Sequence, residues 1–217
     1  MEKKPETQVK IKICGLRTPA DVAAVNAALP EYAGFIFVPM RRRYVAPAQA
    51  AVLCQQLDPR IRPVGVFVDA RVEEILEVLE HCPLDMVQLH GSEDNDYIAM
   101  LRAAYRSRFA VESRNLCIVK AFRVEGMDDI RRAEAFAADE ILLDHGAGGT
   151  GERFDWTLLQ HCRRRFFLAG GLDPDNVENA IRVAQPYAVD ASSSLESDGR
   201  KDPEKIRRFV AAVRRSL

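Results

Sequence analysis

The sequence repeats one pattern along its length, in which a short apolar run is followed by a stretch with helical spacing. In residues 72–79, for example, apolar residues recur at the i, i+3, i+4, i+7 spacing of one helix face. Near-continuous apolar strands separated by crossover helices are typical of a parallel sheet covered by helices. The runs, rich in Val, Ile and Phe, occupy residues 9–14, 33–38, 63–68, 85–90, 117–122, 140–144, 166–170 and 187–192.

Eight strand–helix units in a chain of 217 residues predict a single (β/α)8 barrel domain over residues 1–217. An open doubly wound sheet is the alternative, and the lack of a GxGxxG motif after the first strand disfavours its dinucleotide-binding version. The segment 106–115 is expected to be a slightly enlarged loop. Besides the one near residue 72, helices are expected to begin near Pro19, Pro47, Asp94, Gly126, Asp155, Pro174 and Pro203.

The composition favours a globular protein and argues against two other classes, nucleic-acid binders and membrane proteins. The chain is 47% hydrophobic and 29% charged with a formal net charge of −1, which is ordinary for a globular protein and argues against a generic nucleic-acid binder. It has no apolar run of membrane-spanning length, and its first residues lack the apolar core of a signal peptide, so we expect a cytoplasmic protein without a membrane partner. A monomer and a homodimer are both compatible with this composition.

The five cysteines are odd in number and widely spaced, and no CxxC occurs. A zinc or thioredoxin-like site is therefore not expected, and we predict no metal and free thiols. Most of them fit the role of small buried hydrophobes. Cys14 differs because it stands where the first strand ends, rather than in the middle of a strand.

In (β/α)8 barrels the active site lies at the carboxyl ends of the strands. Polar residues and glycines occur at several of these ends, and barrel closure is expected to gather them into one ring. They are Cys14, Arg43, Asp69, His90, Asp144, Gly170, Gly171, Asp190, Ser192 and Ser193.

Two of these strand ends have the composition of an anion site. Gly170 and Gly171 follow the seventh strand, and Ser192 and Ser193 follow the eighth. Backbone N–H groups of a glycine pair, hydroxyls and a helix N-terminus bind phosphate, and barrels often use these two loops for it. Either loop alone fits a tight turn or a helix cap, but the pair favours a phosphate-binding site.

Cys14 and Asp144, at the ends of the first and sixth strands, are predicted to face each other across the barrel mouth. A thiol and a carboxylate in that arrangement can serve as base and acid on one substrate. Cysteine has a reference pKa of about 8.5, so the site must favour its thiolate, whereas an acid at neutral pH needs an Asp pKa above about 3.9. Taken singly, Cys14 is equally well interpreted as an inert buried thiol, and Asp144 as a helix cap or a member of an ion pair.

Seven longer stretches combine these strand ends with the residues around them. They are KICGLRTPADV, GFIFVPMRRRYV, VGVFVD, VQLHG, LLDHGAGGTGERFDW, LAGGLDPDNV and VDASSSLES. These stretches resemble the motifs of the phosphoribosylanthranilate isomerase family of tryptophan biosynthesis, and they occur in that family's order over nearly the whole chain. The resemblance implies a (β/α)8 barrel and an Amadori rearrangement of the small-molecule substrate phosphoribosylanthranilate to 1-(2-carboxyphenylamino)-1-deoxyribulose 5-phosphate, without cofactor or metal.

The resemblance also implies roles for individual residues. Asp144 is the general acid that opens the ribose ring, and Cys14 is the general base that removes the C2 proton. Arg43 holds the anthranilate carboxylate, where a guanidinium fork suits better than lysine. His90 lines the substrate pocket or is a packed structural histidine. Asp190 orients the ribose hydroxyls or Cys14, or has a structural role in its loop.

The loop 146–151 resembles a mobile cover over the site, with Gly149 and Gly151 assigned to phosphate binding; a plain turn is the alternative. Phe154 and Trp156 are expected to anchor the following helix. If position 194 needs a positive φ, serine is strained where the family tends to have glycine. The chain departs from the family pattern at Val38, Met40, Arg41 and Ser194.

Two other kinds of protein remain as alternatives. A related ribose-phosphate enzyme, such as an indoleglycerol phosphate synthase-like lyase, would use a lysine such as Lys120 near the end of the fifth strand. The histidine-pathway aminoaldose isomerase would show two related half-barrels, each with an acid and a phosphate site. A barrel that binds a phosphorylated ligand without turnover is the alternative outside enzymes, and loss of Cys14 or Asp144 would have favoured it.

Overall fold

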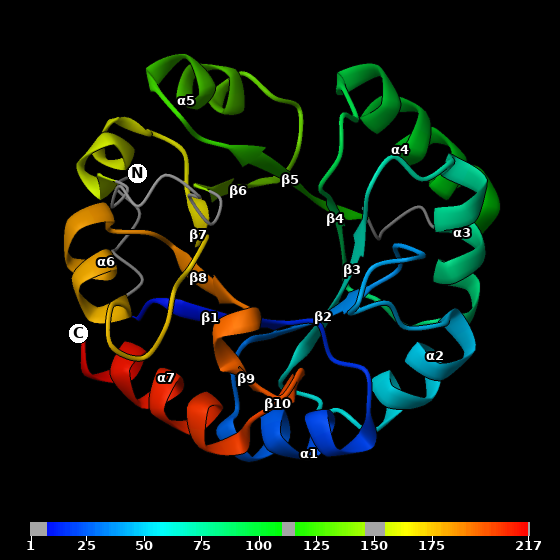
Figure 1. Cartoon of the computed structure of the whole chain (residues 1–217). Helices are drawn as coiled ribbons and strands as arrows, with labels where there is room; N and C mark the ends of the chain where they lie inside the picture. The colour runs from blue at the N-terminus through cyan, green and yellow to red at the C-terminus, as the bar shows by residue number, and fades with distance from the viewer. Residues whose placement is uncertain (1–7, 110–115, 146–154, 217) are drawn as a thin grey trace.

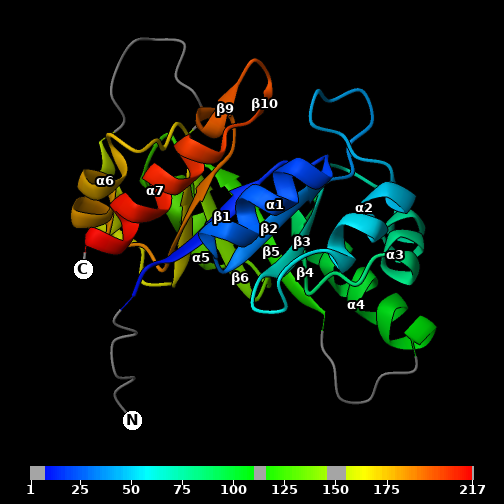
Figure 2. The same ribbon diagram turned by 90° about the horizontal axis from the view of Figure 1, so that it is seen from below.

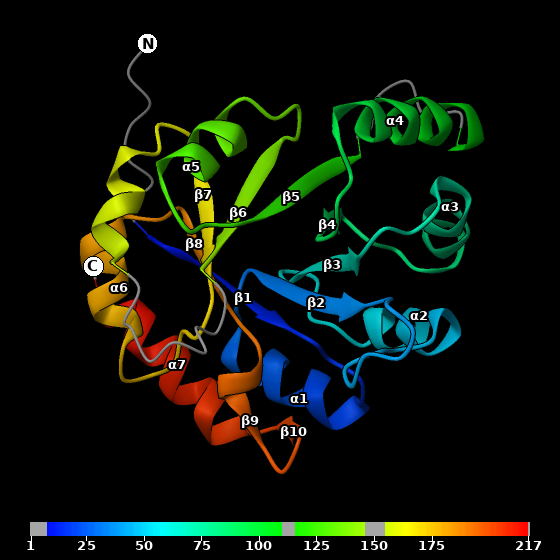
Figure 3. The same ribbon diagram turned by 45° about the horizontal axis from the view of Figure 1, so that its top comes forward.

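The computed structural model describes residues 8–109, 116–145 and 155–216. Eight parallel strands form a closed barrel in which each strand pairs with the next and β8 pairs with β1 (Figures 1 and 3). The predicted fold class is confirmed, since each apolar run forms one strand within one or two residues. The strands are β1 (Lys10–Cys14), β2 (Tyr32–Ile36), β3 (Arg62–Phe67), β4 (Met86–Leu89), β5 (Cys117–Arg123), β6 (Glu140–Asp144), β7 (Phe166–Ala169) and β8 (Ala188–Ala191).

Helices surround this barrel on its outside (Figure 1). α1 is fixed at its start by a capping box between Thr18 and Asp21, with a proline in its first turn. The described helices are α1 (Pro19–Ala28), α2 (Pro47–Gln55), α3 (Val72–His81), α4 (Asn95–Phe109), α5 (Met127–Glu134), α6 (Val177–Ala184), α7 (Pro203–Arg215) and the short 3-10 helices η1 (Trp156–His161) and η2 (Ser193–Leu195).

Three predicted helix boundaries differ from the structure. The stretch after Asp155 forms the six-residue 3-10 helix η1 rather than an α-helix, a form that is common for such short segments. Helix α6 begins at Val177, because Asp173 and Asn176 first form a turn closed by their own side chains. Helix α4 continues to Phe109, so the first part of the predicted loop 106–115 is helical, and the rest lies outside the described residues.

The alternation of side chains along the strands divides the core in two. Outward residues such as Ile11 and Ile13 join the helices in one large buried cluster. Inward residues of the other strands form a separate cluster inside the barrel, where Phe167 contacts Tyr32 edge-on at a centroid distance of 5.3 Å. Trp156 is half-buried against the outer cluster, as expected of an anchor, whereas Phe154 lies outside the described residues.

One end of the barrel carries two additional structures. A small antiparallel hairpin, β9 (Glu196–Ser197) and β10 (Arg200–Lys201), follows β8. Figure 2 shows that this hairpin and the loop between β2 and α2 extend from the same end of the barrel. Residues that follow the carboxyl ends of β2 and β8 are thereby brought together.

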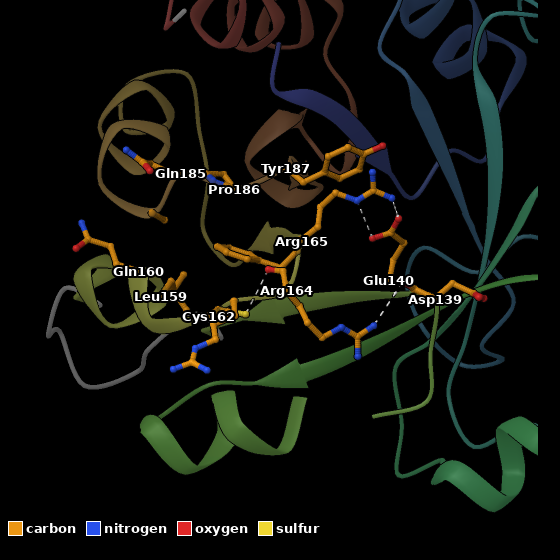
Figure 4. A pocket seen from close by; sticks show the side chains of 13 residues that line it. Asp139, Glu140, Leu159, Gln160, Cys162, Arg164, Arg165, Gln185, Pro186 and Tyr187 are labelled. Carbon is orange, nitrogen blue, oxygen red and sulfur yellow. Dashed lines mark hydrogen bonds and ion pairs between the residues drawn. The ribbon is translucent and has the colours of Figure 1, made fainter. Parts of the chain in front are cut away.

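The opposite end has a groove of about 1130 Å³ between η1, α6 and the starts of β6 to β8 (Figure 4). Arg164 donates hydrogen bonds of 2.7 Å to the carbonyls of Phe136 and Ala138, beyond the end of α5. Arg165 pairs with Glu140 and lies 4.0 Å from the ring centroid of Tyr187. Both guanidinium groups are thus engaged by neighbouring groups at this end of the barrel, although the Arg165 side chain is still 47% exposed.

Candidate active site

A cavity of about 290 Å³ lies at the carboxyl ends of the strands and collects the predicted site residues. Asp69 is the exception, because its carboxylate accepts hydrogen bonds from the backbone and hydroxyl of Ser92 outside this cavity. Gly149, Gly151 and the rest of the loop 146–151 lie outside the described residues. The predicted residues that line the cavity are Cys14, Arg43, His90, Asp144, Gly170, Gly171, Asp190, Ser192 and Ser193.

Cys14 ends β1 with its thiol at the base of the cavity and only 6% of its surface exposed. Its register partner on β2 is Gly34, where a Cβ would lie 2.6 Å from Cys14 Sγ. Burial raises the pKa of Cys14, the charges of Lys12 and Lys201 oppose that rise, and Asp190 adds to it. The thiol therefore needs a cationic neighbour if it is to act as a base.

Such a neighbour is present two residues earlier on the same strand. Lys12 is 1% exposed, and its Nζ lies 2.9 Å from Asp190 Oδ2 in an ion pair inside the barrel. Asp190 is its register partner on β8, so barrel closure creates the pair. Among the described residues, Asp190 Oδ1 is buried without a hydrogen-bond partner. Sequence reasoning missed Lys12, because lysines that alternate with Ile along a strand are typical of a solvent-facing side.

Asp144 ends β6 beside Gly170, where a Cβ would lie 2.7 Å from Asp144 Oδ1. Gly170 has a φ of +98°, a conformation that glycine adopts without strain. His90 Nε2 lies 3.7 Å from Asp144 Oδ2, while Gln88 Nε2 donates to His90 Nδ1 at 2.9 Å. Burial lowers the pKa of His90 despite the charge of Asp144, which favours the neutral ring at neutral pH.

Arg43 reaches the cavity from the loop after β2, but one side of its guanidinium is already engaged. Its Nε donates to Glu196 Oε1 at 2.6 Å. Arg42, whose side chain is 56% exposed, pairs with Glu196 as well. Lys201 Nζ completes the cluster at 3.4 Å from Glu196 Oε1. Glu196 and Lys201 had no sequence signal, since they meet Arg43 only through the hairpin β9–β10.

The loops after β7 and β8 form the other side of the cavity. Gly170 and Gly171 both have positive φ, and Ser192 Oγ donates to the carbonyl of Cys14 at 2.9 Å. Lys201 Nζ donates to the carbonyl of Ser192 at 2.9 Å. Ser194 is not among the residues with positive φ and donates to the carbonyl of Leu172, so the strain expected at position 194 is absent.

Lys120 lies on β5 and is not among the residues that line this cavity. Its Nζ is 3.2 Å from Glu93 Oε2 and donates to the carbonyl of Gly91 at 2.7 Å. Glu93 also accepts hydrogen bonds from the backbone of Asp69 and Gly91. The lysine on which the lyase alternative depends is therefore part of a buried structural cluster.

The family model described as N-(5'-phosphoribosyl)anthranilate (PRA) isomerase matches residues 11–212. The chain belongs to this family. An N-(5'-phosphoribosyl)anthranilate isomerase of Geobacter sp. (strain M21) is 40% identical over 213 residues, which cover 95% of this chain and 98% of that protein. One of Endomicrobium trichonymphae is 42% identical over 209 residues, or 94% of this chain and 98% of that protein.

Solved structures of PRA isomerases agree with the whole barrel. The enzyme of Thermotoga maritima superposes with a TM-score of 0.82 at 35% identity and covers 95% of this chain and 98% of its own. A PRA isomerase in complex with reduced 1-(o-carboxyphenylamino)-1-deoxyribulose 5-phosphate superposes with a TM-score of 0.80 at 34% identity, with the same coverage. The resemblance identified in the sequence and the prediction of an isomerase are confirmed.

Two further observations concern metal sites and membrane-spanning helices. Within residues 8–109, 116–145 and 155–216, no three His, Cys, Asp or Glu side chains gather as a metal ion would require. None of the helices in these ranges combines the length and the apolar character needed to cross a membrane.

Proposed function

We propose that this chain converts phosphoribosylanthranilate to 1-(2-carboxyphenylamino)-1-deoxyribulose 5-phosphate with Cys14 as general base and Asp144 as general acid. The observation that carries the proposal is that a thiol from β1 and a carboxylate from β6 line one cavity of about 290 Å³. Membership of the PRA isomerase family supplies the reaction. The product analogue bound to a solved relative supports the substrate class.

The reaction needs two proton transfers on one sugar. Protonated Asp144 gives its proton to the ribose ring oxygen, the C1–O bond breaks, and the nitrogen lone pair forms the C1=N bond of a Schiff base. The Cys14 thiolate then takes the proton from C2, and the electrons of that bond neutralise the iminium nitrogen as an enolamine. Loss of the enol proton and protonation at C1 give the ketone, so atoms and charge balance without a redox partner.

The remaining lining residues fit the two ends of the substrate. We assign the phosphate to the loops with Gly170, Gly171, Ser192 and Ser193, and the anthranilate carboxylate to the side of Arg43 turned away from Glu196. Asp190 Oδ1 is a hydrogen-bond acceptor for a ribose hydroxyl. His90 Nε2 lies 3.7 Å from Asp144 Oδ2, so we assign the imidazole to the pocket wall beside the acid.

The proposal is tested by turnover of freshly made phosphoribosylanthranilate, followed as loss of anthranilate-type fluorescence. Cys14→Ala and Asp144→Asn should each lower kcat by at least about 100-fold with the fold retained, because each removes one proton transfer. Cys162→Ala is the matched control, since Cys162 is a half-buried thiol outside the cavity. A folded wild type that binds a product-like phosphate without turnover would instead identify a binding barrel.

The setting of the enzyme is also proposed. All five cysteines are free thiols, which supports a reducing cytoplasm. A relative from Thermotoga maritima is described as dimeric. We propose that this chain is a monomer or a homodimer, and sedimentation at micromolar concentration distinguishes the two.

A further inference from the structure

Lys12 is a buried ammonium that the reaction scheme above does not use. It is 1% exposed and lies inside the barrel, where an unpaired charge is strongly destabilising. Its hydrogen-bond partner, Asp190 Oδ2, accepts only one of its three N–H donors. A barrel interior that needed only volume would hold an aliphatic side chain here, so the charge itself requires an explanation.

The strand geometry aims this ammonium at the reactive thiol. Lys12 and Cys14 are two residues apart on β1 and therefore point to the same side of the strand, into the barrel. The positive charge of Lys12 opposes the rise that burial produces in the pKa of the Cys14 thiol, and so favours its thiolate form. The pair Lys12–Asp190 is neutral as a whole, but the charge of Lys12 lowers the pKa of Cys14 more than the charge of Asp190 raises it.

The other charged groups around the thiol do not supply the same contact. Asp190 on β8 and Asp144 on β6 are acidic, and burial lowers the pKa of His90, which follows β4, so that the neutral ring is favoured. Arg43 and Lys201 are cationic but hold Glu196 between them. Lys12 is therefore the cation placed to stabilise negative charge on Cys14 from inside the barrel.

We propose that Lys12 is a positioning residue of the catalytic base: its ammonium hydrogen-bonds the Cys14 thiolate, and Asp190 holds the ammonium in place. This inference rests on the proposed function, in which the thiolate removes the C2 proton. When the thiolate accepts that proton, its hydrogen bond to Lys12 weakens while Lys12 keeps its own proton. Lys12 thus acts on the equilibrium that forms the base and not as a proton carrier.

The test compares the pH profile of kcat/KM for wild type and Lys12→Met. Loss of the ammonium should move the limb that depends on Cys14 by at least one pH unit toward higher pH, so that turnover at pH 7 falls about tenfold or more. A second readout needs no substrate: the rate of Cys14 alkylation by iodoacetamide, resolved by peptide mass spectrometry, should shift in the same direction.

Two further variants separate this effect from loss of structure. Lys12→Met/Asp190→Asn removes both charges, leaves no unpaired ion, and should still show the shifted alkylation profile of Cys14. Lys120→Met is the matched control, because it removes another buried ammonium from an ion pair, with Glu93. It should leave the Cys14 profile within about 0.3 pH units of wild type.

The outcomes also separate this inference from the proposed function. If Cys14→Ala keeps full turnover, the proposed base is wrong, whatever the alkylation profile shows. If Cys14 is required but its pH limb and alkylation profile are unchanged in both folded Lys12 variants, the proposed role of Lys12 is overturned and only a structural ion pair remains.

Discussion

Each of the two proposed catalytic side chains lies beside a glycine, whose lack of a side chain leaves room for it in the cavity. Cys14 faces Gly34 and Asp144 faces Gly170, and in both cases a Cβ would come within 2.7 Å of the reactive group. Such contacts are far inside van der Waals distance. The rotamers of the proposed acid and base are therefore set by the absence of a side chain next door, as much as by their own bonds.

Gly34→Ala should test this dependence. The added methyl group occupies the space of Cys14 Sγ, so the thiol must turn, and we expect kcat/KM to fall at least about tenfold with little loss of secondary structure. Circular dichroism and the turnover assay measure the two effects. Gly126→Ala is the control, because nothing lies within 4 Å of a Cβ there; equal losses in both variants would contradict the argument.

Single residues also show where sequence reasoning succeeds and where it stops. Cys14 and Asp144 were predicted as site residues because a polar residue at the end of an apolar run can be recognised from the sequence alone. Lys12 was not predicted, because its partner Asp190 is 178 residues away and appears only when β8 closes on β1. Glu196, which is 153 residues from Arg43, was missed for the same reason.

At the scale of elements, the hairpin β9–β10 connects both ends of the proposed substrate site. Glu196 on β9 holds Arg43, the proposed carboxylate-binding residue. Lys201 on β10 holds the carbonyl of Ser192, in the proposed phosphate loop. Although burial favours its neutral form, hydrogen bonds from Arg43 and the charge of Lys201 lower the pKa of Glu196, so this carboxylate stays ionised at neutral pH.

Glu196→Gln should therefore affect binding more than chemistry. The guanidinium of Arg43 loses its carboxylate partner and its fixed orientation, so we expect KM to rise about tenfold while kcat changes much less. Steady-state kinetics with phosphoribosylanthranilate measures both constants. Glu204→Gln, which removes an exposed carboxylate paired with Arg207, is the control. A fall in kcat alone would show that Glu196 acts on the chemical step instead.

The eight strands were predictable because near-continuous burial on both faces gives each one a compact apolar run. The form of the connection before β7 was not, because η1 has only six residues, too few for the i, i+3, i+4, i+7 spacing that identifies an α-helix. The start of α6 was misplaced by three residues, because the side chains of Asp173 and Asn176 imitate a helix start. Local hydrogen bonding of this kind competes with helix formation without changing the apolar pattern.

Across the whole molecule, the two ends of the barrel serve different purposes. At the lower end, Arg164 and Arg165 bind backbone carbonyls, Glu140 and Tyr187, which tie strand starts to neighbouring elements. At the upper end, Lys120 and Glu93 connect β5 to the loops that follow β3 and β4. The proposed catalytic cavity thus lies beside a rim that has its own buried ion pair.

Lys120→Met should therefore lower the stability of the barrel without lowering its activity. Removing one partner of a buried pair leaves Glu93 with its backbone donors only, and we expect a loss of about 3 kcal/mol in the free energy of unfolding. Urea unfolding followed by circular dichroism measures the loss, and Lys120→Met/Glu93→Gln should recover part of it, because no buried charge is then left without its counterion.

The same variant should keep the kcat of wild type at temperatures where it is folded, since Lys120 does not line the cavity. Arg131→Met, which breaks an exposed pair with Asp128, is the surface control and should shift the urea midpoint only slightly. A large loss of kcat in folded Lys120→Met would mean that the rim pair shapes the cavity as well as the barrel. Unchanged stability would mean that Glu93 is held by its backbone donors alone, and that barrel closure does not depend on this pair.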